Sequence, residues 1–347
     1  MVATWFFLLA FMLTAYVVLD GFDLGAGTLH LLVAKTDAER RTVLAAIGPV
    51  WDGNEVWLVA SGGILAFAFP RTFAAAFSGF YLPVTILLWL IVLRGMAIEL
   101  RSHVRHPLWS AFWDTVFAGS STAIAFVLGV ALGNVVRGVP VDGSGYFAAP
   151  LFTDFRPGPR PGALDWYTFL FGALGVACLT AHAANYLVWK TQGPVHDRAR
   201  ARLPIAWTLA GTLLAMVTGA TAFVAPGLFA RFAARAWVWP MPALALASGA
   251  ASVLARARHR ERAAFLGSTL FVAFSLLGAA LVFFPTMLPS TLERTFDLDA
   301  YNASSAPHGL FLGLVWWTPA LAIAVLYFGI LFRSIRGKVN PSAEDGH

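Results

Sequence analysis

Two carboxylates interrupt the first apolar segment of this sequence. Asp20 and Asp23 lie in the stretch YVVLDGFDLGAG, residues 16–27, between runs of leucine, valine and phenylalanine. A charged side chain near the centre of a bilayer costs about 2.5–3.5 kcal/mol on insertion scales. Such groups face a bundle interior or a wet cavity, where they form ion pairs or exchange protons. The two aspartates therefore predict a buried site that handles protons or holds an ion pair.

Further ionisable residues follow in the next two apolar segments. Asp52 and Glu55 are three residues apart and so share one helix face, as the first two aspartates do. Arg94 and Glu99 come near the end of the third segment, and we expect Arg94 to pair with one of the first two aspartates. For Asp52, Glu55 and Glu99, and equally for Asp114 in the fourth segment, a structural ion at the wet interface is as good an interpretation as a functional one.

The elements that position these residues are membrane helices. The chain is 59% hydrophobic and only 12% charged, whereas an ordinary soluble domain has about 25% charged residues. Apolar stretches long enough to cross about 30 Å of hydrocarbon recur along it. The sequence predicts an all-α polytopic membrane protein with nine transmembrane helices, at residues 4–33, 51–69, 77–98, 114–136, 164–189, 204–225, 237–255, 263–285 and 308–332.

The distribution of lysine and arginine predicts the orientation. Seventeen of the 24 basic residues fall in segments that nine crossings place on one side, namely 35–41, 94–105, 190–202, 256–262 and 333–338. The positive-inside rule makes this side cytoplasmic, with the N-terminus outside and the C-terminus inside. The net charge of +6 is then a topological signal and does not indicate nucleic-acid binding. The acids lie in the cytoplasmic half of their segments, and the outer half is almost purely apolar.

We predict one membrane domain, 1–347, with an internal division. Residues 1–136 would form a first four-helix bundle, 137–163 an outer loop rich in glycine and proline, and 164–285 a second four-helix bundle. Residues 286–347 would add an outer loop, a ninth helix and a cytoplasmic tail, whose end at 340–347 we expect to be disordered.

The histidines decide whether the chain itself could carry haem, which needs axial ligands inside the membrane. His30, His182 and His308 are the candidates, and none recurs at a spacing that would hold two haems between helices. A lone histidine in a membrane helix is more often a helix contact or a proton relay. We therefore expect no haem and no metal ion in this chain. The single cysteine, Cys178, excludes a disulfide within the chain.

Five motifs, in the order of the family and over nearly the whole chain, resemble subunit II of the cytochrome bd-type quinol oxidases, including the cyanide-insensitive branch. They are LDGFDLGAG (19–27), GPVWDGNEVW (48–57), LRGMAIELR (93–101), AHAANYLVWKT (181–191) and YNASSAP (301–307). Asp20, Asp23 and Asp52 match acidic positions of the family. Arg94 and Glu99 match the third-helix motif, and His182 and Trp57 match motif positions of less clear role. Glu55 is a departure, because some members have glutamine there.

The resemblance implies a subunit of an oxygen-reducing quinol oxidase in the bacterial inner membrane. Its partner, subunit I, would carry two haems b and one haem d and oxidise quinol on the outer side. Subunit II would bind no haem, stabilise its partner and supply cytoplasmic protons for water formation. A small single-helix subunit and membrane lipid are further candidate partners, and no nucleic acid is expected. This chain alone would not be catalytic.

We hypothesise that Asp52 and Glu55 collect protons at the cytoplasmic mouth, and that Asp23 and Asp20 relay them with Arg94 setting their proton affinity. Two alternatives remain at this point. One is a proton-coupled secondary transporter with a carboxylate site at mid-membrane, which would need a polar path on both sides. The other is a purely structural subunit whose acids only lock helices together.

Overall fold

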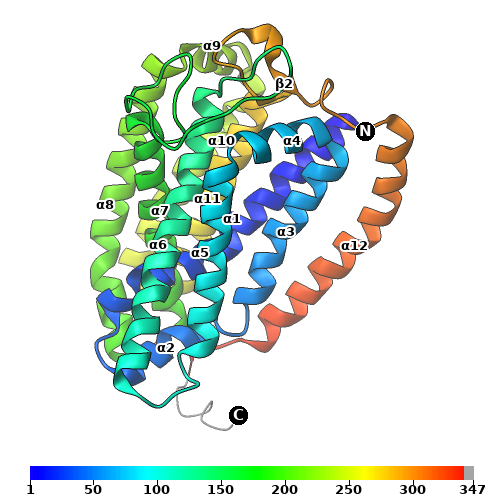
Figure 1. The fold of residues 1–347 in the computed structure, drawn as a ribbon. Helices are drawn as coiled ribbons and strands as arrows, with labels where there is room; N and C mark the ends of the chain where they lie inside the picture. The colour runs from blue at the N-terminus through cyan, green and yellow to red at the C-terminus, as the bar shows by residue number, and fades with distance from the viewer. Residues whose placement is uncertain (340–347) are drawn as a thin grey trace.

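The computed structural model describes residues 1–339, and helices dominate it (Figure 1). The predicted disordered end, 340–347, lies outside the described residues. In chain order the elements are α1 (Val2–Val33), α2 (Asp37–Ile47), α3 (Trp51–Ala68), α4 (Pro70–Gly79), α5 (Tyr81–Leu100), α6 (Pro107–Arg137), α7 (Trp166–Lys190), α8 (Gly193–Val224), α9 (Pro226–Ala234), η1 (Ala236–Val238), α10 (Pro240–Ala257), α11 (Glu261–Phe283), β1 (Thr286–Leu288), η2 (Arg294–Phe296), β2 (Leu298–Asp299) and α12 (Pro307–Ser334).

Within residues 1–339, eight helices are by themselves long and apolar enough to cross a membrane, α10 being counted together with η1. The one predicted segment not among these eight is 51–69, which corresponds to α3, whose 18 residues span about 27 Å. It is apolar enough only together with α4, and the two helices meet at 119°. The bend falls at Phe69, whose backbone is not helical, and Pro70 then begins α4. The predicted all-α membrane fold is confirmed, with the bent pair as its ninth span.

Two predicted boundaries are wrong, because α6 begins at Pro107, seven residues before the span expected at 114–136, and α8 also begins early. The apolar segment expected at 204–225 belongs to α8, which begins at Gly193 and carries Pro204 in its interior. Hydropathy locates the part of a helix that lies in hydrocarbon, but the helix continues into the polar stretch before it. Proline is tolerated inside membrane helices when other groups satisfy the freed carbonyl.

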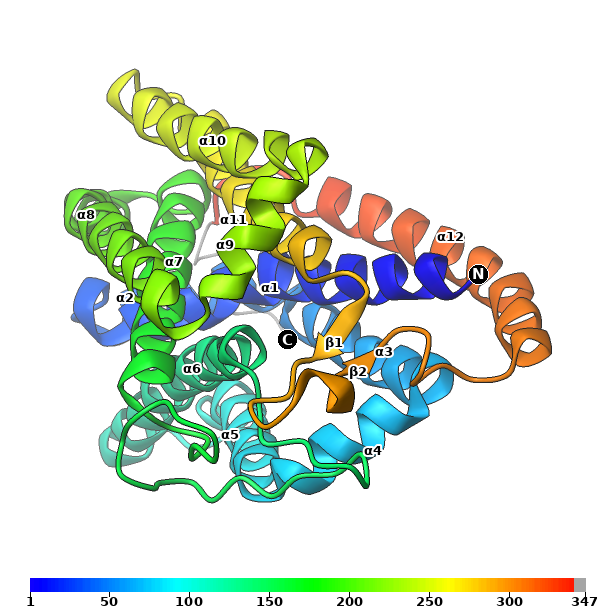
Figure 2. The ribbon, with the colours of Figure 1, turned by 90° about the horizontal axis from the view of Figure 1, so that it is seen from above.

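Helix α1 lies at the centre of the bundle and packs against α3, α6, α7 and α11 (Figure 2). Helix α5 packs on α6, α8 on α7, and α10 on α11. Helix α12 lies at the edge of the bundle (Figure 2), where Leu310 is its one buried residue and Phe328 contacts Trp57 of α3. The proposed division of the chain into two four-helix bundles stays a prediction.

The two long loops meet at one end of the bundle. The antiparallel strands β1 and β2 lie in the second loop. The first loop joins them there, because the Val139 N–H donates to the Pro289 carbonyl at 2.9 Å and Thr291 N–H donates to the Val139 carbonyl at 3.0 Å. The short connections, α2 and the described C-terminal residues lie at the other end (Figure 1). The basic segments therefore gather at one end of the molecule, as their spacing predicted.

Candidate functional site

The acidic stretch of α1 is held tightly because its glycines allow close helix contact. A methyl group at Gly25 would overlap the backbone carbonyl oxygen of Leu179 and the side chain of Ala183, both on α7. A side chain at Gly27 would overlap Ser121 on α6. Small residues let membrane helices approach each other in this way. The aspartates of α1 are therefore fixed between packed helices and have little freedom to turn toward lipid.

Asp20 and Glu55 share one guanidinium group. Arg94 reaches from α5, where its Nη1 donates to Asp20 Oδ2 at 2.9 Å and its Nη2 lies 2.7 Å from Asp20 Oδ1. The same Nη2 donates to Glu55 Oε1 on α3. The Asp20 and Arg94 side chains are each 1% exposed, whereas the Glu55 side chain is 21% exposed. Glu55 is therefore the member of this group that reaches the surface of the chain.

Asp23 has no cation among the described residues. Its Oδ2 accepts a hydrogen bond of 2.7 Å from the amide of Asn54, which also donates to the Leu19 carbonyl at 3.2 Å. Asp23 Oδ1 and Asn54 Oδ1 are buried and have no hydrogen-bond partner within residues 1–339. Arg94 thus pairs with the first aspartate of the motif and not with the second. Sequence reasoning missed Asn54, although it lies between two acids in the motif WDGNEVW.

Four charged side chains from α1, α3 and α5 lie together with the amide of Asn54. We call these five residues the carboxylate cluster: Asp20, Asp23, Asn54, Glu55 and Arg94. The structure does not bring Asp52 and Glu99 into it. Both are exposed, Asp52 in the first turn of α3 and Glu99 in the last turn of α5. Neither forms an ion pair with any residue of the described chain.

His182 and Trp57 lie in different surroundings. The His182 Nε2–H donates to the Val18 carbonyl at 3.1 Å, so in the neutral ring Nδ1 accepts from the Ser268 hydroxyl at 2.8 Å. Its ring stacks on Phe265. Trp57 is buried against Phe328, and its indole N–H has no partner within residues 1–339. His182 is thus a contact among α7, α1 and α11.

The candidate haem ligands are already engaged or exposed. A haem iron at His182 would have to displace one of its two hydrogen bonds. His30 uses Nε2 to bind Asp114 at 2.7 Å and keeps Nδ1 buried without a partner in residues 1–339. His308 is exposed at the start of α12. No group of three metal-ligating side chains occurs in the described chain, and the absence of haem from this subunit stays a prediction.

A second ionic network lies at the same end of the bundle as the basic segments. Asp114 is buried and accepts from Arg101 at 2.6 Å, from Arg40 at 2.9 Å and from His30. Arg101 also donates to Asp37 of α2 at 2.7 Å. Two guanidinium groups contact one buried carboxylate here, so the negative charge of Asp114 is fully compensated. It ties α1, α2, α5 and α6 together, which supports the structural interpretation of Asp114.

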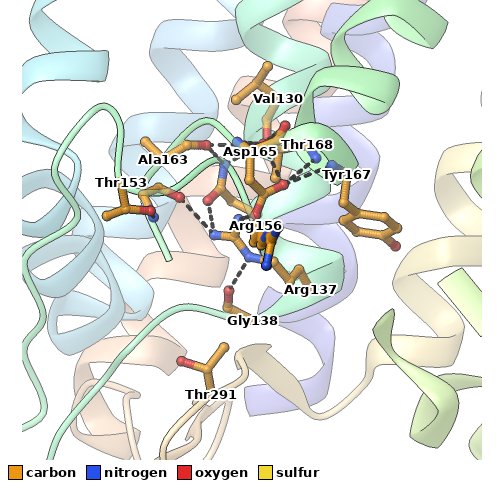
Figure 3. Close-up of polar contacts among 12 residues, drawn as sticks. Val130, Arg137, Gly138, Thr153, Arg156, Ala163, Asp165, Tyr167, Thr168 and Thr291 are labelled. Atoms are coloured by element: carbon orange, nitrogen blue, oxygen red, sulfur yellow. Dashed lines mark hydrogen bonds and ion pairs between the residues drawn. The ribbon is translucent and has the colours of Figure 1, made fainter. Parts of the chain in front are cut away.

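The opposite end also holds a buried ion pair, which the sequence did not indicate. Arg137 at the end of α6 donates to Asp165, to the Asn134 amide oxygen at 2.6 Å and to the Gly138 carbonyl at 3.2 Å (Figure 3). Asp165 also caps α7 by accepting from the Thr168 N–H at 2.9 Å. This pair closes the base of the first long loop.

Outside the membrane segments, α2 carries a further salt bridge. Glu39 accepts from Arg198 at 2.7 Å and from the backbone N–H of Lys35 at 2.5 Å. The Arg198 guanidinium and these backbone donors lower the pKa of Glu39 from 4.5 to about 2. Glu39 also completes a capping box with Thr36 at the start of α2.

A bundle of membrane-spanning helices that encloses a carboxylate cluster defines a polytopic membrane protein with ionisable groups in its interior. Comparison with known proteins identifies it further. Residues 1–335 match the family of cytochrome bd terminal oxidase subunit II, and the chain belongs to this family.

Individual relatives agree with this assignment. The chain is 30% identical to the cytochrome bd-I ubiquinol oxidase subunit 2 of Escherichia coli (strain K12), over 93% of this chain and 90% of that protein. It is 31% identical to the probable cytochrome oxidase subunit 2 of Haemophilus influenzae, over 98% and 96%. The structure of bd oxidase from Geobacillus thermodenitrificans has the same fold, with a TM-score of 0.72 and 19% identity over 96% and 98% of the two chains.

Family membership confirms the resemblance carried by the five motifs. The chain is a subunit of an oxidoreductase, the terminal oxidase of a respiratory chain, and a multi-pass protein of the bacterial inner membrane. The alternative of a proton-coupled secondary transporter is thereby set aside.

Proposed function

We propose that this chain is the non-haem subunit of a bd-type quinol:oxygen oxidoreductase. It supports a haem-bearing subunit I, which carries two haems b and one haem d, and it brings protons from the cytoplasm toward the site of oxygen reduction. The relatives named as ubiquinol oxidase subunits support the first part. The carboxylate cluster supports the second.

The observation that carries the proton route is a charge count. Asp20 and Glu55 contact one guanidinium, that of Arg94, and Asp23, three residues from Asp20 on α1, is bonded to the amide of Asn54 and has no cation of its own. If all three carboxyl groups were ionised, two negative charges would remain uncompensated in a buried site, which a low-dielectric interior does not tolerate. The cluster is therefore best accommodated with at least one proton bound. A group that holds a proton beside a water-accessible carboxyl is suited to pass that proton on.

The geometry supports an order for the route. Glu55 is partly exposed on α3 and would receive protons, with Asp52 one turn nearer to the start of that helix. Asp23 is buried without a cation and has a free oxygen, so it would carry the proton inward. Glu99 on α5 would contribute charge at the mouth, and His182 would serve as an auxiliary contact. The positive-inside rule supports a cytoplasmic mouth, because the basic segments lie at that end.

The test is oxygen consumption by the complex purified through a tag on this chain, with quinol supplied in excess. Asp23→Asn keeps the side chain's size and its hydrogen bond to Asn54 but removes the ionisable group. We expect oxygen reduction to slow by tenfold or more while the absorption bands of haem b and haem d are retained. Glu293→Gln, at an exposed position in the second long loop and outside the proposed route, is the control and should lose little.

Two results would contradict the proposal. Full turnover in the Asp23→Asn complex would assign the acids a purely structural role. A preparation that contains this chain alone, with no haem and no second membrane subunit, would remove the basis for a support role.

A further inference from the structure

Six arginines gather at one corner of the basic end, where α8 begins and α10 turns into α11. We call them the arginine cluster: Arg200, Arg202, Arg256, Arg258, Arg260 and Arg262. His259 lies at the turn with a φ of 55°, and the Arg260 N–H donates to the Ala255 carbonyl at 2.9 Å. This tight turn places consecutive basic residues at the end of the α10–α11 pair.

No member of the arginine cluster has a carboxylate partner in residues 1–339, whereas the segments 35–41, 94–105 and 333–338 each contain at least one ion pair. Elsewhere at this end, Arg40 pairs with Asp114, and Arg198 pairs with Glu39. None of the six arginines lies within 4.0 Å of a carboxylate oxygen of residues 1–339. The acid in the turn itself, Glu261, is bound by His196 and Lys338. The structure therefore leaves six positive charges uncompensated in one place.

The arginine cluster is bound only weakly by other groups of the chain. Arg200 donates to His259 Nδ1 at 2.9 Å, a contact between two basic side chains. The cavity between Arg200, Arg256 and His259 measures about 10 Å³, which is room for about one water molecule. An anion would therefore bind on the surface of the cluster rather than between the helices. Guanidinium groups are well suited to phosphate oxygens, which they contact in a bidentate manner.

Exposed apolar side chains follow the arginines along the same helices. Ile205 and Leu209 of α8 are 62% and 50% exposed, and Leu254 of α10 is 58% exposed. Leu266 and Leu270 of α11 are exposed as well. These residues lie within about three turns of the arginines. An anion that carries acyl chains matches both surfaces at once, whereas free phosphate matches only the arginines.

We propose that the arginine cluster binds the headgroup of an anionic phospholipid, whose acyl chains lie along the exposed apolar residues of α8, α10 and α11. Basic pockets at the ends of membrane helices bind anionic headgroups by this combination of charge and apolar contact. The lipid would neutralise charge that no described residue of this chain neutralises. The site is separate from the carboxylate cluster and does not depend on the proposed proton route.

The test is binding of cardiolipin to the whole purified complex, counted by native mass spectrometry during a titration in detergent. The variant Arg256→Gln, Arg258→Gln, Arg262→Gln removes half of the cluster. The matched control is Arg105→Gln, Arg333→Gln, Arg336→Gln, which removes three arginines that also lack a carboxylate partner within residues 1–339 at the same end. Each arginine near a membrane surface contributes about fivefold to the affinity for anionic lipid, so the cluster variant should bind about 100-fold more weakly. The control should change the affinity much less.

Additional measurements identify the molecule that binds to the arginine cluster. Phosphatidylcholine should not bind in place of cardiolipin, and an excess of inorganic phosphate should not displace it; displacement by phosphate alone would overturn the assignment to a lipid. An equal loss of cardiolipin affinity in both triple variants would also overturn the assignment. The effect would then come from the total positive charge of this end and not from the arginine cluster. If the triple variant assembles poorly, Arg258→Gln and Arg262→Gln are tested singly, since both positions are exposed. Binding that appears only after Glu344→Gln and Asp345→Asn would assign the arginines to the chain's own end instead.

Discussion

Replacing Arg94 by glutamine should be among the most destabilising single changes in this chain. Arg94 is 1% exposed and is the one cation that contacts both Asp20 and Glu55 in residues 1–339. Its loss leaves a fully buried carboxylate, Asp20, without compensation. Breaking a buried ion pair by removing one partner costs about 3–5 kcal/mol. We expect the upper part of this range, about 4–5 kcal/mol, because two carboxyl groups lose their partner. This lowers the folding equilibrium constant by about three to nearly four orders of magnitude.

A double-mutant cycle separates the ion pair from other effects of the substitution. Asp20→Asn in the Arg94→Gln background removes the uncompensated charge, so the double variant should be more stable than Arg94→Gln alone. The assay is the free energy of unfolding of the purified complex in detergent, followed by tryptophan fluorescence. Arg105→Gln is the control, because Arg105 is exposed and has no ion pair within residues 1–339, and it should change stability by less than about 0.5 kcal/mol.

The reasoning fails if the two single changes simply add in the double variant. Additivity would mean that Asp20 and Arg94 do not interact energetically, since coupled neighbours deviate from the sum by about 0.5–3 kcal/mol. The charge count behind the proposed proton route would then lose its basis as well.

Three further predictions concern helix contact, the loop end and pH. Gly25→Ala should prevent α1 from approaching α7 and reduce the yield of assembled complex, whereas Gly62→Ala, which has open space, should not. Arg137→Gln should cost about 3–5 kcal/mol and expose the loop after α6 to limited proteolysis, and adding Asp165→Asn should restore part of the loss. The pKa of Glu39 falls to about 2 from 4.5, so its stabilising effect is present above pH 4.5 and is lost as the pH falls toward 2. The difference in Tm between wild type and Glu39→Gln should therefore shrink over that interval.

The membrane spans could be predicted from the sequence because hydrocarbon leaves the backbone few choices. Every backbone polar group in the bilayer must be satisfied within its own helix, so an apolar run of sufficient length is a helix. This holds for α1 and α12, whose predicted ranges agree with the structure to within a few residues. It fails where other forces act. Helix α8 extends into water beyond its apolar part, and α3 ends at Phe69, where packing and proline turn the chain by 119°.

The candidate site could be predicted only as a set of residues. Acids in apolar segments indicate burial, and their spacing on a helix indicates a shared face. Asn54 carries no charge and therefore gave no such signal, although it provides the hydrogen bond to Asp23. Arg137 and Asp165 escaped notice because they lie at opposite ends of a long loop, which only folding brings together.

The sequence by itself determined that this is a membrane bundle of the bd oxidase subunit II family with acids in its interior and most of its basic residues at one end. Only the tertiary structure decided which acid receives the cation. Asp20 and Asp23 are equivalent in spacing and surroundings along the chain, yet Arg94 reaches Asp20 and Glu55, while Asp23 is left with an amide. The physical reason is that the partner of a buried charge depends on which helices meet at its depth, and that contact is set by packing between distant segments.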